Sequence, residues 1–421
     1  MLFALSTLVL LCSCLCSWLI NPVNSISTWK LINFAIIGTS FIGVWKYFPK
    51  ELSKKKQVML ILTLAIVARA LMLGMPPSDD INRYLWEGKI VLAGESPYKA
   101  PAIDERYKAY HDEYWKKMNH KDWLTAYPPL TELIFAAIAV VSYTPIAYKL
   151  VFILFDLLTL GMILQYAYTK PNIPIGNAVL FALNPIVLFG IAGEAHFDSI
   201  FLCFTFASIL LMNTKKQSAW AWFFLGLSLQ VKIVSILLVP LFLLKGEWKK
   251  SWAILPALII PSLFFASSIE GMFDGLLHFG GKTSFNGPIY TFIEFLLKDK
   301  ALTSLICTGA LAISGAFIYL KSKSLFKGAY LLFGALILFS PIVHYWYIYW
   351  AIPFAAIYGS LAWATLSLCS CLYFLACITF DNTGIWSIPA WGLWLEWTPF
   401  IILLIIKNKL NLLEPKKLFN L

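Results

Sequence analysis

The chain has 421 residues, of which 60% are hydrophobic and only 13% are charged. Soluble domains carry about 25% charged residues, so this composition excludes a surface covered by water. The formal net charge of +11 does not indicate nucleic-acid binding, because the lysines lie in short clusters between apolar stretches and form no single basic stripe. The composition therefore predicts an all-α integral membrane protein with many spans.

Apolar stretches of about 20 residues, long enough to cross a bilayer as a helix, recur along the whole chain. The first one lacks the basic start of a cleaved signal peptide and is expected to be retained. We expect spans at 2–20, 31–48, 57–75, 147–168, 177–192, 197–213, 251–268, 301–319, 328–342, 345–363, 364–380 and 387–406. They form one integral membrane domain (1–421), with an N-terminal helix pair (1–56), a central module (57–300) and C-terminal helices (301–421).

The lysine clusters predict which ends of these spans face the cytoplasm. Loops rich in Lys and Arg stay inside, which here applies to the clusters at 54–56, 215–216, 245–250 and 321–327. The span at 57–75 then leads outward, and the loop 76–128 is predicted to be external.

Two apolar stretches do not fit a simple count of spans. If Lys170 is also inside, only one crossing separates it from the external loop, so 130–143 must be an interfacial or re-entrant helix. The stretch 218–244 is flanked by lysines at both ends and should enter the membrane and return, with its turn near Lys232.

The loop 76–128 carries most of the external polar residues. It holds 9 of the 22 acidic residues and 8 basic residues in 53 positions. Helix connections usually take about 2–8 residues, and a long, aromatic-rich connection is more often functional than idle. The loop is therefore the first place to look for a site.

Its first motif, SDDINRYLWEG at 78–88, follows directly on a span. Asp79 and Asp80 repel each other, which raises the pKa of one of them unless a cation compensates. Arg83 lies one helical turn further on and is expected to orient a general base at Asp80 or Asp79. The simpler interpretation is an interfacial helix capped by one of the two aspartates.

The turn GEAHFD at 193–198 alternates Glu194, His196 and Asp198 between two spans. Two carboxylates and an imidazole can bind substrate or a divalent metal such as Mg²⁺ or Mn²⁺, with Glu194 and Asp198 as the ligands. Ionisable residues at membrane depth are costly and are functional candidates for that reason. A solvated turn is the alternative.

Lys232 is an isolated cation in the apolar run SLQVKIVSILLVP. It either extends outward to the interface or meets an anionic group in a cavity, where a lipid phosphate would suit it.

Four further residues complete the candidate site. Tyr98 and Tyr127 lie at Pro-containing corners that bracket the external loop, and a purely structural role explains such corners equally well. The segment 280–287 offers Lys282 and Asn286 but lacks the spacing of a P-loop. His344 lies in an aromatic belt, where membrane anchoring is the alternative.

Taken in order, five segments of this chain resemble bacterial GT-C membrane glycosyltransferases, namely the family-87-like and polyprenol-phosphate-mannose-dependent mannosyltransferases. The segments are SDDINRYLWEGKIVLAGESPY, TAYPPLTELIF, LNPIVLFGIAGEAHFDS, SFNGPIY and SPIVHYWYIYWAIPF. The resemblance runs from about residue 57 to 363, and the external loop is its most specific part. The core Asp80–Tyr84 is also similar to the aminoarabinose transferases of the same superfamily, in which the acid in the place of Asp80 is the proposed catalytic one.

The resemblance implies a GT-C-type helix bundle in a bacterial inner membrane, with its active site facing the periplasm. It implies transfer of a hexose, with mannose favoured, from a polyprenyl-phosphate donor to a lipid- or glycan-linked acceptor. Inversion with an Asp general base is expected, and Glu87, Arg83 and Lys232 are expected to help bind the donor. Glu87 stands where Asp is usual, which leaves the sugar open.

A multi-pass transporter or flippase of a lipid-linked or sugar substrate is the alternative. Transporters usually show internal repeats and midplane sites. The sequence has no evident repeat, and the long external loop would be superfluous for transport.

Overall fold

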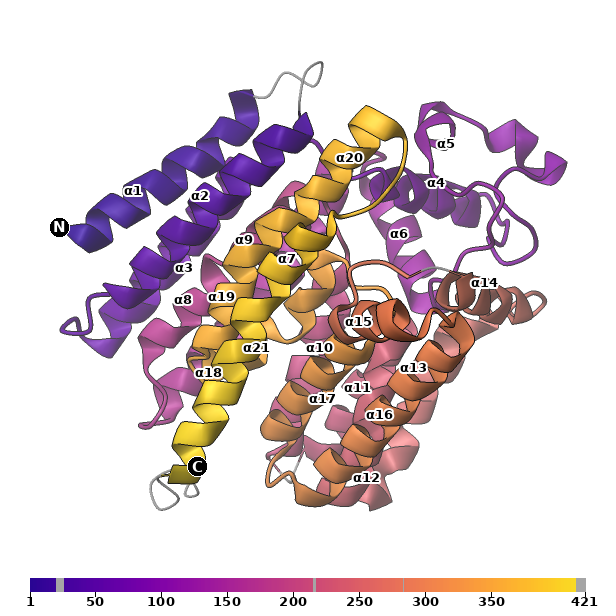
Figure 1. Ribbon diagram of the computed structural model, residues 1–421. Helices are drawn as coiled ribbons and strands as arrows, with labels where there is room; N and C mark the ends of the chain where they lie inside the picture. The colour runs from indigo at the N-terminus through magenta and orange to yellow at the C-terminus, as the bar shows by residue number, and fades with distance from the viewer. Residues whose placement is uncertain (20–25, 215–216, 283, 414–421) are drawn as a thin grey trace.

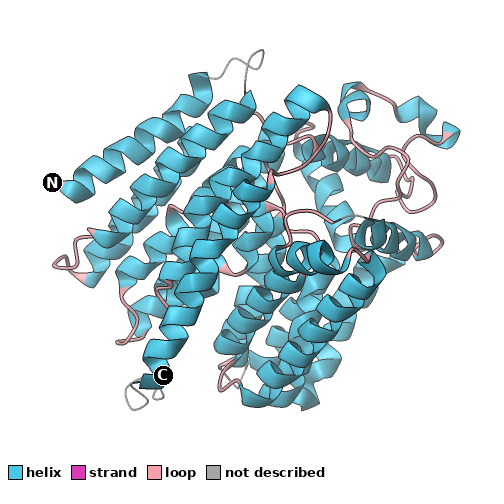
Figure 2. Ribbon diagram, in the orientation of Figure 1, coloured by secondary structure: helices cyan, strands magenta, loops and turns pink. Residues whose placement is uncertain are grey.

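The structure is a computed structural model that describes residues 1–19, 26–214, 217–282 and 284–413, without the side chains of 279–282 and 407–413. Helices dominate, and these described residues contain no β-strand (Figure 2). Within them, five helices are long and apolar enough to cross a membrane: Leu2–Leu19, Ile26–Lys46, Pro145–Thr169, Lys300–Lys321 and Leu361–Thr383. The prediction of an all-α polytopic membrane protein is confirmed.

The N-terminal part is a group of three helices, α1 (Leu2–Leu15, continued by a 3-10 turn Cys16–Leu19), α2 (Ile26–Lys46) and α3 (Lys54–Met72). α1 packs along both α2 and α3, and Figure 1 shows the three side by side at one edge of the bundle. The Ser53 hydroxyl accepts a hydrogen bond from the backbone N–H of Lys56 and so caps the start of α3.

The loop predicted to be external folds into a small layer of its own. It contains α4 (Asp80–Leu92), a 3-10 helix Glu105–Tyr110 and α5 (Glu113–Lys117), and leads into α6 (Pro129–Val141). α4 packs on both α5 and α6, and Figure 1 shows all three together at the upper right of the bundle. With 13 residues, α6 is about 20 Å long, too short for a hydrocarbon core of about 30 Å. This length agrees with the interfacial helix expected at 130–143.

The next segment contains a broken span. It comprises α7 (Pro145–Thr169), a 3-10 helix Ile175–Ala178, α8 (Val179–Ala182), α9 (Pro185–Val187), a π-helix Leu188–Gly193 and α10 (Asp198–Met212). The continuous span expected at 177–192 is bent by 41°. Asn184 causes the break, because its side chain caps the Ile186 N–H and Pro185 begins the next helix.

Two helical arms follow, separated at Lys232. α11 (Ser218–Val231) is the first arm, and a 3-10 helix Ile233–Leu238 with α12 (Val239–Lys245) is the second. The Trp222 indole donates to the Glu247 carbonyl at 3.1 Å, so both arms end at the same level of the bundle. The two arms with a break at Lys232 agree with the hairpin expected over 218–244, and its entry into the membrane stays a prediction.

The remaining elements are a 3-10 helix Trp248–Ala253, α13 (Ile254–Leu263), α14 (Glu270–Lys282), α15 (Pro288–Leu297), α16 (Lys300–Lys321), α17 (Leu325–Phe339), a 3-10 helix Tyr345–Trp350, α18 (Ile352–Ile357), α19 (Leu361–Cys369), a 3-10 helix Ser370–Phe374, α20 (Leu375–Thr383) and α21 (Ala390–Leu413). The single span expected at 345–363 is wrong. The helical segment that starts at Tyr345 ends at Ile357, and Gly359 then turns the chain with a φ of +56° before α19 starts.

A fully buried ion pair joins the centre of the bundle. The Arg69 guanidinium of α3 lies 2.5 Å from the Asp156 carboxylate of α7 and donates to the Ala182 carbonyl of α8 at 2.7 Å. The Tyr349 hydroxyl donates to the same carboxylate at 3.0 Å. Four segments therefore meet through one charge pair.

The external placement of the loop 76–128 stays a prediction, which Lys108→Cys in a cysteine-free background tests. Lys108 has a side chain 71% exposed at the loop surface, so an impermeant maleimide should label it in intact cells. Lys249→Cys, in an exposed lysine-rich turn at the other end of the bundle, is the matched control and should label only after lysis. The reverse pattern would invert the topology.

Loss of one partner of the buried pair should destabilise the protein strongly. Asp156→Leu leaves the Arg69 charge uncompensated, and breaking such a pair costs about 3–5 kcal/mol. Thermal unfolding in detergent should show a large drop in Tm, which the double variant Arg69→Met/Asp156→Leu partly restores because both charges are then gone. Equal Tm values for the single variant and the unmodified protein would contradict this.

Candidate functional site

The two adjacent aspartates lie at the start of α4. Asp79 is exposed, and the Asp80 side chain is 28% exposed. Asp79 has helical backbone angles (φ −64°, ψ −24°), whereas capping residues usually have extended ones, and its carboxylate makes no capping hydrogen bond. Asp79 therefore does not supply the side-chain cap that the simpler interpretation expected from one of the two aspartates, and its carboxylate is directed elsewhere.

A side-chain amide holds the two carboxylates. Asn119 Nδ2 donates to Asp79 Oδ2 and to Asp80 Oδ1, each at 3.0 Å. Desolvation and the adjacent charge of Asp80 raise the pKa of Asp79, and the hydrogen bond from Asn119 opposes this rise. The sequence pattern did not identify Asn119, because an asparagine in a polar loop carries no distinguishing signal.

Arg83 does not pair with the aspartates. Its guanidinium donates to Glu87 Oε1 at 2.9 Å and to the carbonyls of Asn119 at 3.0 Å and His120 at 2.6 Å. The expected ion pair between Arg83 and Asp80 is replaced by these contacts. Arg83 thus holds the segment that carries Asn119 against α4.

Glu87 meets a second buried carboxyl, Glu132 of α6. The Thr125 hydroxyl lies 3.0 Å from Glu132 Oε1 and 3.4 Å from Glu87 Oε2. Burial raises the pKa of Glu87, although Arg83 counteracts this effect. Two buried carboxyls beside one guanidinium balance in charge when they share one proton.

The turn at 193–198 is anchored to the aspartate segment through its backbone. The Glu194 carbonyl accepts hydrogen bonds from the Ser78 N–H at 3.0 Å and from the Ser78 hydroxyl at 3.1 Å. Ala195 has a φ of +66°, an uncommon left-handed conformation for a residue with a side chain. The turn is therefore held in a specific shape, and its anchor, Ser78, lies two residues before Asp80.

The Glu194 side chain bonds two residues that sequence reasoning missed. Its Oε1 accepts from Lys30 Nζ of α2 and its Oε2 from the Tyr345 hydroxyl, both at 2.6 Å. Burial opposes ionisation, but Lys30 and His196 outweigh it, so the pKa of Glu194 lies well below its ordinary value. Lys30 could have been found by the signal that marked Lys232, a lone cation in an apolar helix.

His196 lies between Asp80 and Glu194. Its Nδ1 is 3.7 Å from Asp80 Oδ2, and its Nε2 is 3.6 Å from Glu194 Oε2. Both distances slightly exceed a hydrogen bond, as is common for catalytic contacts before substrate binds. The structure thus brings together three of the predicted residues.

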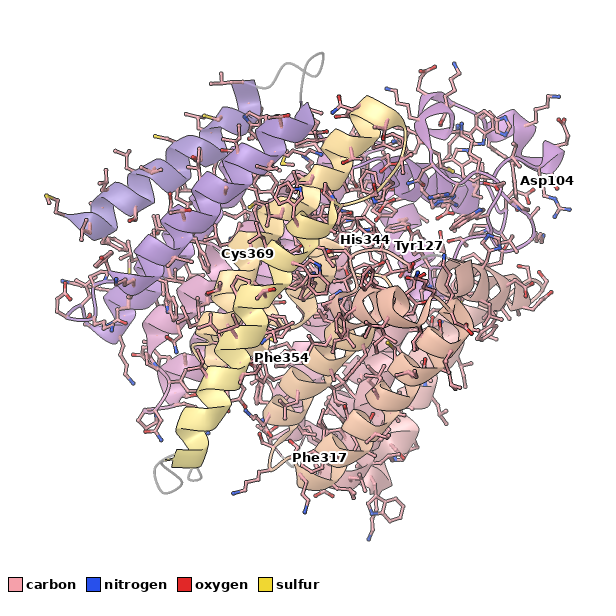
Figure 3. The ribbon with its side chains drawn as sticks, in the orientation of Figure 1. Asp104, Tyr127, Phe317, His344, Phe354 and Cys369 are labelled. Atoms are coloured by element: carbon pink, nitrogen blue, oxygen red, sulfur yellow. The ribbon has the colours of Figure 1, made fainter. Side chains whose placement is uncertain are left out.

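An aromatic stack continues from His196. Its ring lies parallel to Trp346 at 3.8 Å between centroids, and the other side of Trp346 stacks on His344 at 4.4 Å. His344 Nδ1 is 2.8 Å from the Tyr373 hydroxyl. Burial lowers the pKa of His344 to about 4, so this imidazole is neutral near pH 7. His344 and Tyr127 are both labelled in Figure 3.

Lys232 has a partner from another segment. Its Nζ lies 2.6 Å from Asp198 Oδ1, which also accepts from the Trp350 indole at 2.6 Å. Its ammonium lies 4.9 Å from the centre of the Tyr347 ring. The Lys232 side chain is 22% exposed and directed at an acid, which disagrees with simple extension to the interface.

These groups share one region. Asp80, His196, Lys232 and Asp198 all act electrostatically on the His344 imidazole. Asp104, in contrast, lies at the outer edge of the loop 76–128 (Figure 3).

Tyr98 and Tyr127 brace the loop. The Tyr98 hydroxyl donates to the Tyr127 carbonyl at 2.7 Å, and the Tyr127 ring packs edge-on against Tyr84 and Phe197. These contacts fit the structural interpretation of the two corners, while Phe197 connects Tyr127 to the 193–198 turn.

Asn286 lies beside the aromatic stack, and the side chain of Lys282 lies outside the described residues. Asn286 Nδ2 donates to the Val343 carbonyl at 3.2 Å, next to His344, and its Oδ1 accepts from the Trp397 indole at 3.2 Å. Its φ of +57° is one that asparagine tolerates better than most residues.

Asp80 differs from three nearby carboxylates in having no Lys or Arg partner in the described part of the chain, a property that it shares with Asp79, but of this pair only Asp80 lies within 4.0 Å of a His196 nitrogen. Glu87, Glu194 and Asp198 each lie within 3 Å of a cation. Among the described residues, no Lys or Arg nitrogen lies within 4.0 Å of Asp80, whose neighbours are Asn119 and His196. A partly exposed carboxylate without a neutralising cation is suited to accept a proton.

Glu194 and Asp198 do not form a shared metal site, because each carboxylate bonds a different lysine. Within the described side chains, no group of three or more His, Cys, Asp or Glu residues is arranged to hold a metal ion.

Comparison with known proteins gives one match. A family model described as "Alpha-(1->6)-mannopyranosyltransferase, N-terminal domain" matches residues 11–245, which is more than half of the chain. The matched range includes the candidate site residues from Asp79 to Lys232. No curated protein and no solved structure matches the chain.

Proposed function

Since the chain belongs to the alpha-(1->6)-mannopyranosyltransferase family, we propose that it transfers mannose from a polyprenyl-phosphate donor to a lipid- or glycan-linked acceptor. The chain is a membrane-integral member of this mannosyltransferase family. We further propose that it lies in a bacterial inner membrane and works on the external face, where the loop 76–128 is expected.

The observation that carries the mechanism is the position of Asp80. Its carboxylate is partly exposed, unpaired with any Lys or Arg of the described residues, and next to His196 and Asn119. In the proposed reaction, the acceptor hydroxyl attacks the anomeric carbon and its proton passes to Asp80. The bond from that carbon to the phosphate oxygen breaks, and the polyprenyl phosphate leaves with the electron pair, so the configuration inverts.

The leaving group needs little protonation, because a phosphate already stabilises the negative charge. A nearby cation stabilises it further in the transition state. Lys232 suits this role better than Arg83, which is committed to Glu87 and two carbonyls. Lys232 is bound to Asp198 alone by a short contact and has aromatic rings around it.

The aromatic stack supports sugar binding. Trp346 lies between His196 and His344, and Tyr347 follows it near Lys232. The two imidazoles cover both faces of Trp346, so a sugar would meet the edge of this stack, where imidazole nitrogens can hydrogen-bond to its hydroxyls.

The most direct test supplies purified protein with radiolabelled polyprenyl-phosphate mannose, polyprenyl-phosphate glucose and GDP-mannose. We expect consumption of the first only. Use of GDP-mannose alone would refute the lipid-linked donor, and transport of the lipid without transfer would refute the enzyme.

Asp80→Asn should abolish turnover while preserving the fold. Loss of a general base costs about 10²–10⁴ in rate. Asp79→Asn is the matched control: it keeps an acceptor for Asn119 and caps no helix, so it should retain activity within about tenfold and a normal Tm. Consumption of the labelled donor by both variants is measured beside their thermal unfolding.

Near-normal turnover by Asp80→Asn would refute the assignment of Asp80 as the general base. An inactive Asp79→Asn beside it would assign the role to Asp79 instead.

Lys232→Met should weaken use of the donor, since the methionine keeps the length of the side chain and removes its charge. We expect kcat/KM for the donor to fall at least tenfold, equivalent to about 1.4 kcal/mol. Lys89→Met is the control, because Lys89 pairs with Asp112 at 2.8 Å on the external loop in a comparable ion pair. Unchanged donor kinetics in Lys232→Met would remove Lys232 from the site.

A further inference from the structure

Three Lys and Arg side chains are fully buried among the described residues, and one of them has no acidic partner. Arg69 pairs with Asp156, and Arg83 pairs with Glu87. Lys149, on α7, is only 2% exposed, yet no carboxylate of the described residues lies within 4.0 Å of its ammonium. A buried charge without a counter-ion is costly.

Backbone carbonyls satisfy only part of Lys149. Its Nζ donates to the Met75 carbonyl at 2.5 Å and to the Leu73 carbonyl at 3.2 Å, just beyond the end of α3. An ammonium has three N–H donors, and these two contacts use two of them. Carbonyl dipoles carry no net charge, so one donor and the positive charge remain available to an anion.

Lys149 lines an open groove of about 400 Å³, whose walls include Trp18, Met75, Pro76, Pro77 and Ile146. The other lining residues supply no charged side chain. The groove therefore combines an apolar wall with one cation.

The position of the groove fits the headgroup level of a bilayer. It lies where the candidate span Leu2–Leu19 ends and where Pro145–Thr169 begins. Trp18 is 57% exposed at this level, where Trp side chains favour the membrane interface. Below the groove, α7 exposes an apolar row at four-residue spacing, formed by Ile146, Leu150, Leu154 and Leu158. An acyl chain can follow this row while its phosphate reaches Lys149.

We propose that this groove binds the phosphate group of an anionic phospholipid of the bilayer. The phosphate supplies the negative charge that Lys149 lacks and accepts its remaining N–H, and the acyl chains lie along α7. Neither Asp80, His196 nor Lys232 lines the groove, so the proposal does not depend on the proposed function.

A lipid bound in the groove would also restrict the motion of residues 75–80, the segment that leads into α4. Met75 lines it, and Ser78, three residues later, donates to the Glu194 carbonyl just before Asp79 and Asp80. A bound lipid therefore restricts the segment from which α4 starts.

The test measures lipid binding to the purified full-length protein by native mass spectrometry during titration with phosphatidylglycerol or phosphatidylcholine. We expect phosphatidylglycerol to bind at least tenfold more tightly, and Lys149→Met to abolish the difference. Lys149→Arg, which keeps the charge, should retain it. Lys108→Met removes an exposed external lysine and should leave it unchanged.

Ile146→Trp provides a second route if Lys149→Met fails to fold, because it fills the groove from its exposed edge and keeps the cation. It should weaken phosphatidylglycerol binding at least tenfold. An unchanged lipid preference in the folded variants would overturn the proposal. A second result would also overturn it: an equimolar polyprenyl phosphate displaces phosphatidylglycerol from the unmodified protein, and Lys149→Met no longer binds the polyprenyl phosphate. That result would assign the groove to the donor.

Discussion

The convergence of three segments on Glu194 is the interaction on which the rest of the site depends. Lys30 arrives from α2, Tyr345 from the 3-10 helix after α17, and Ser78 from the end of the segment that follows α3. Lys30 neutralises the buried carboxylate, Tyr345 donates a hydrogen bond to it, and Ser78 binds its backbone carbonyl. Because His196 follows two residues later, this junction also sets the distance between the imidazole and Asp80.

Neutralisation of three nearby carboxylates, together with its position beside His196, sets Asp80 apart as the proposed base. Buried charges must be paired to be tolerated, and Glu87, Glu194 and Asp198 each have a lysine or arginine partner. Asp80 is partly exposed and can be hydrated, so it needs no cation. The same bundle thus contains structural charge pairs beside Asp80, a carboxylate that no Lys or Arg of the described residues neutralises.

The membrane environment explains why the helices break around the site. Irregular backbone at membrane depth is tolerated where other protein groups satisfy it. Asn184 caps the helix that starts after the break at 184, and the carbonyls after α3 receive the Lys149 ammonium. The unwound segments are the ones that carry Glu194, His196 and His344, three of the residues proposed to meet the substrate.

Composition and charge patterning alone determined the fold class, the extended polar loop and the break near Lys232, and the motifs selected Asp80, Glu194 and His196 as candidates, which the structure brings together. Hydropathy is local, since the bilayer selects each span by the residues within it. The partners were decided only by the tertiary structure. Lys30 lies 164 residues from Glu194 in the sequence, and Asn119 lies 39 residues from Asp80. Arg83 bonds Glu87 and loop carbonyls instead of the two aspartates. Which charges meet depends on how distant helices pack, and no local pattern contains that information.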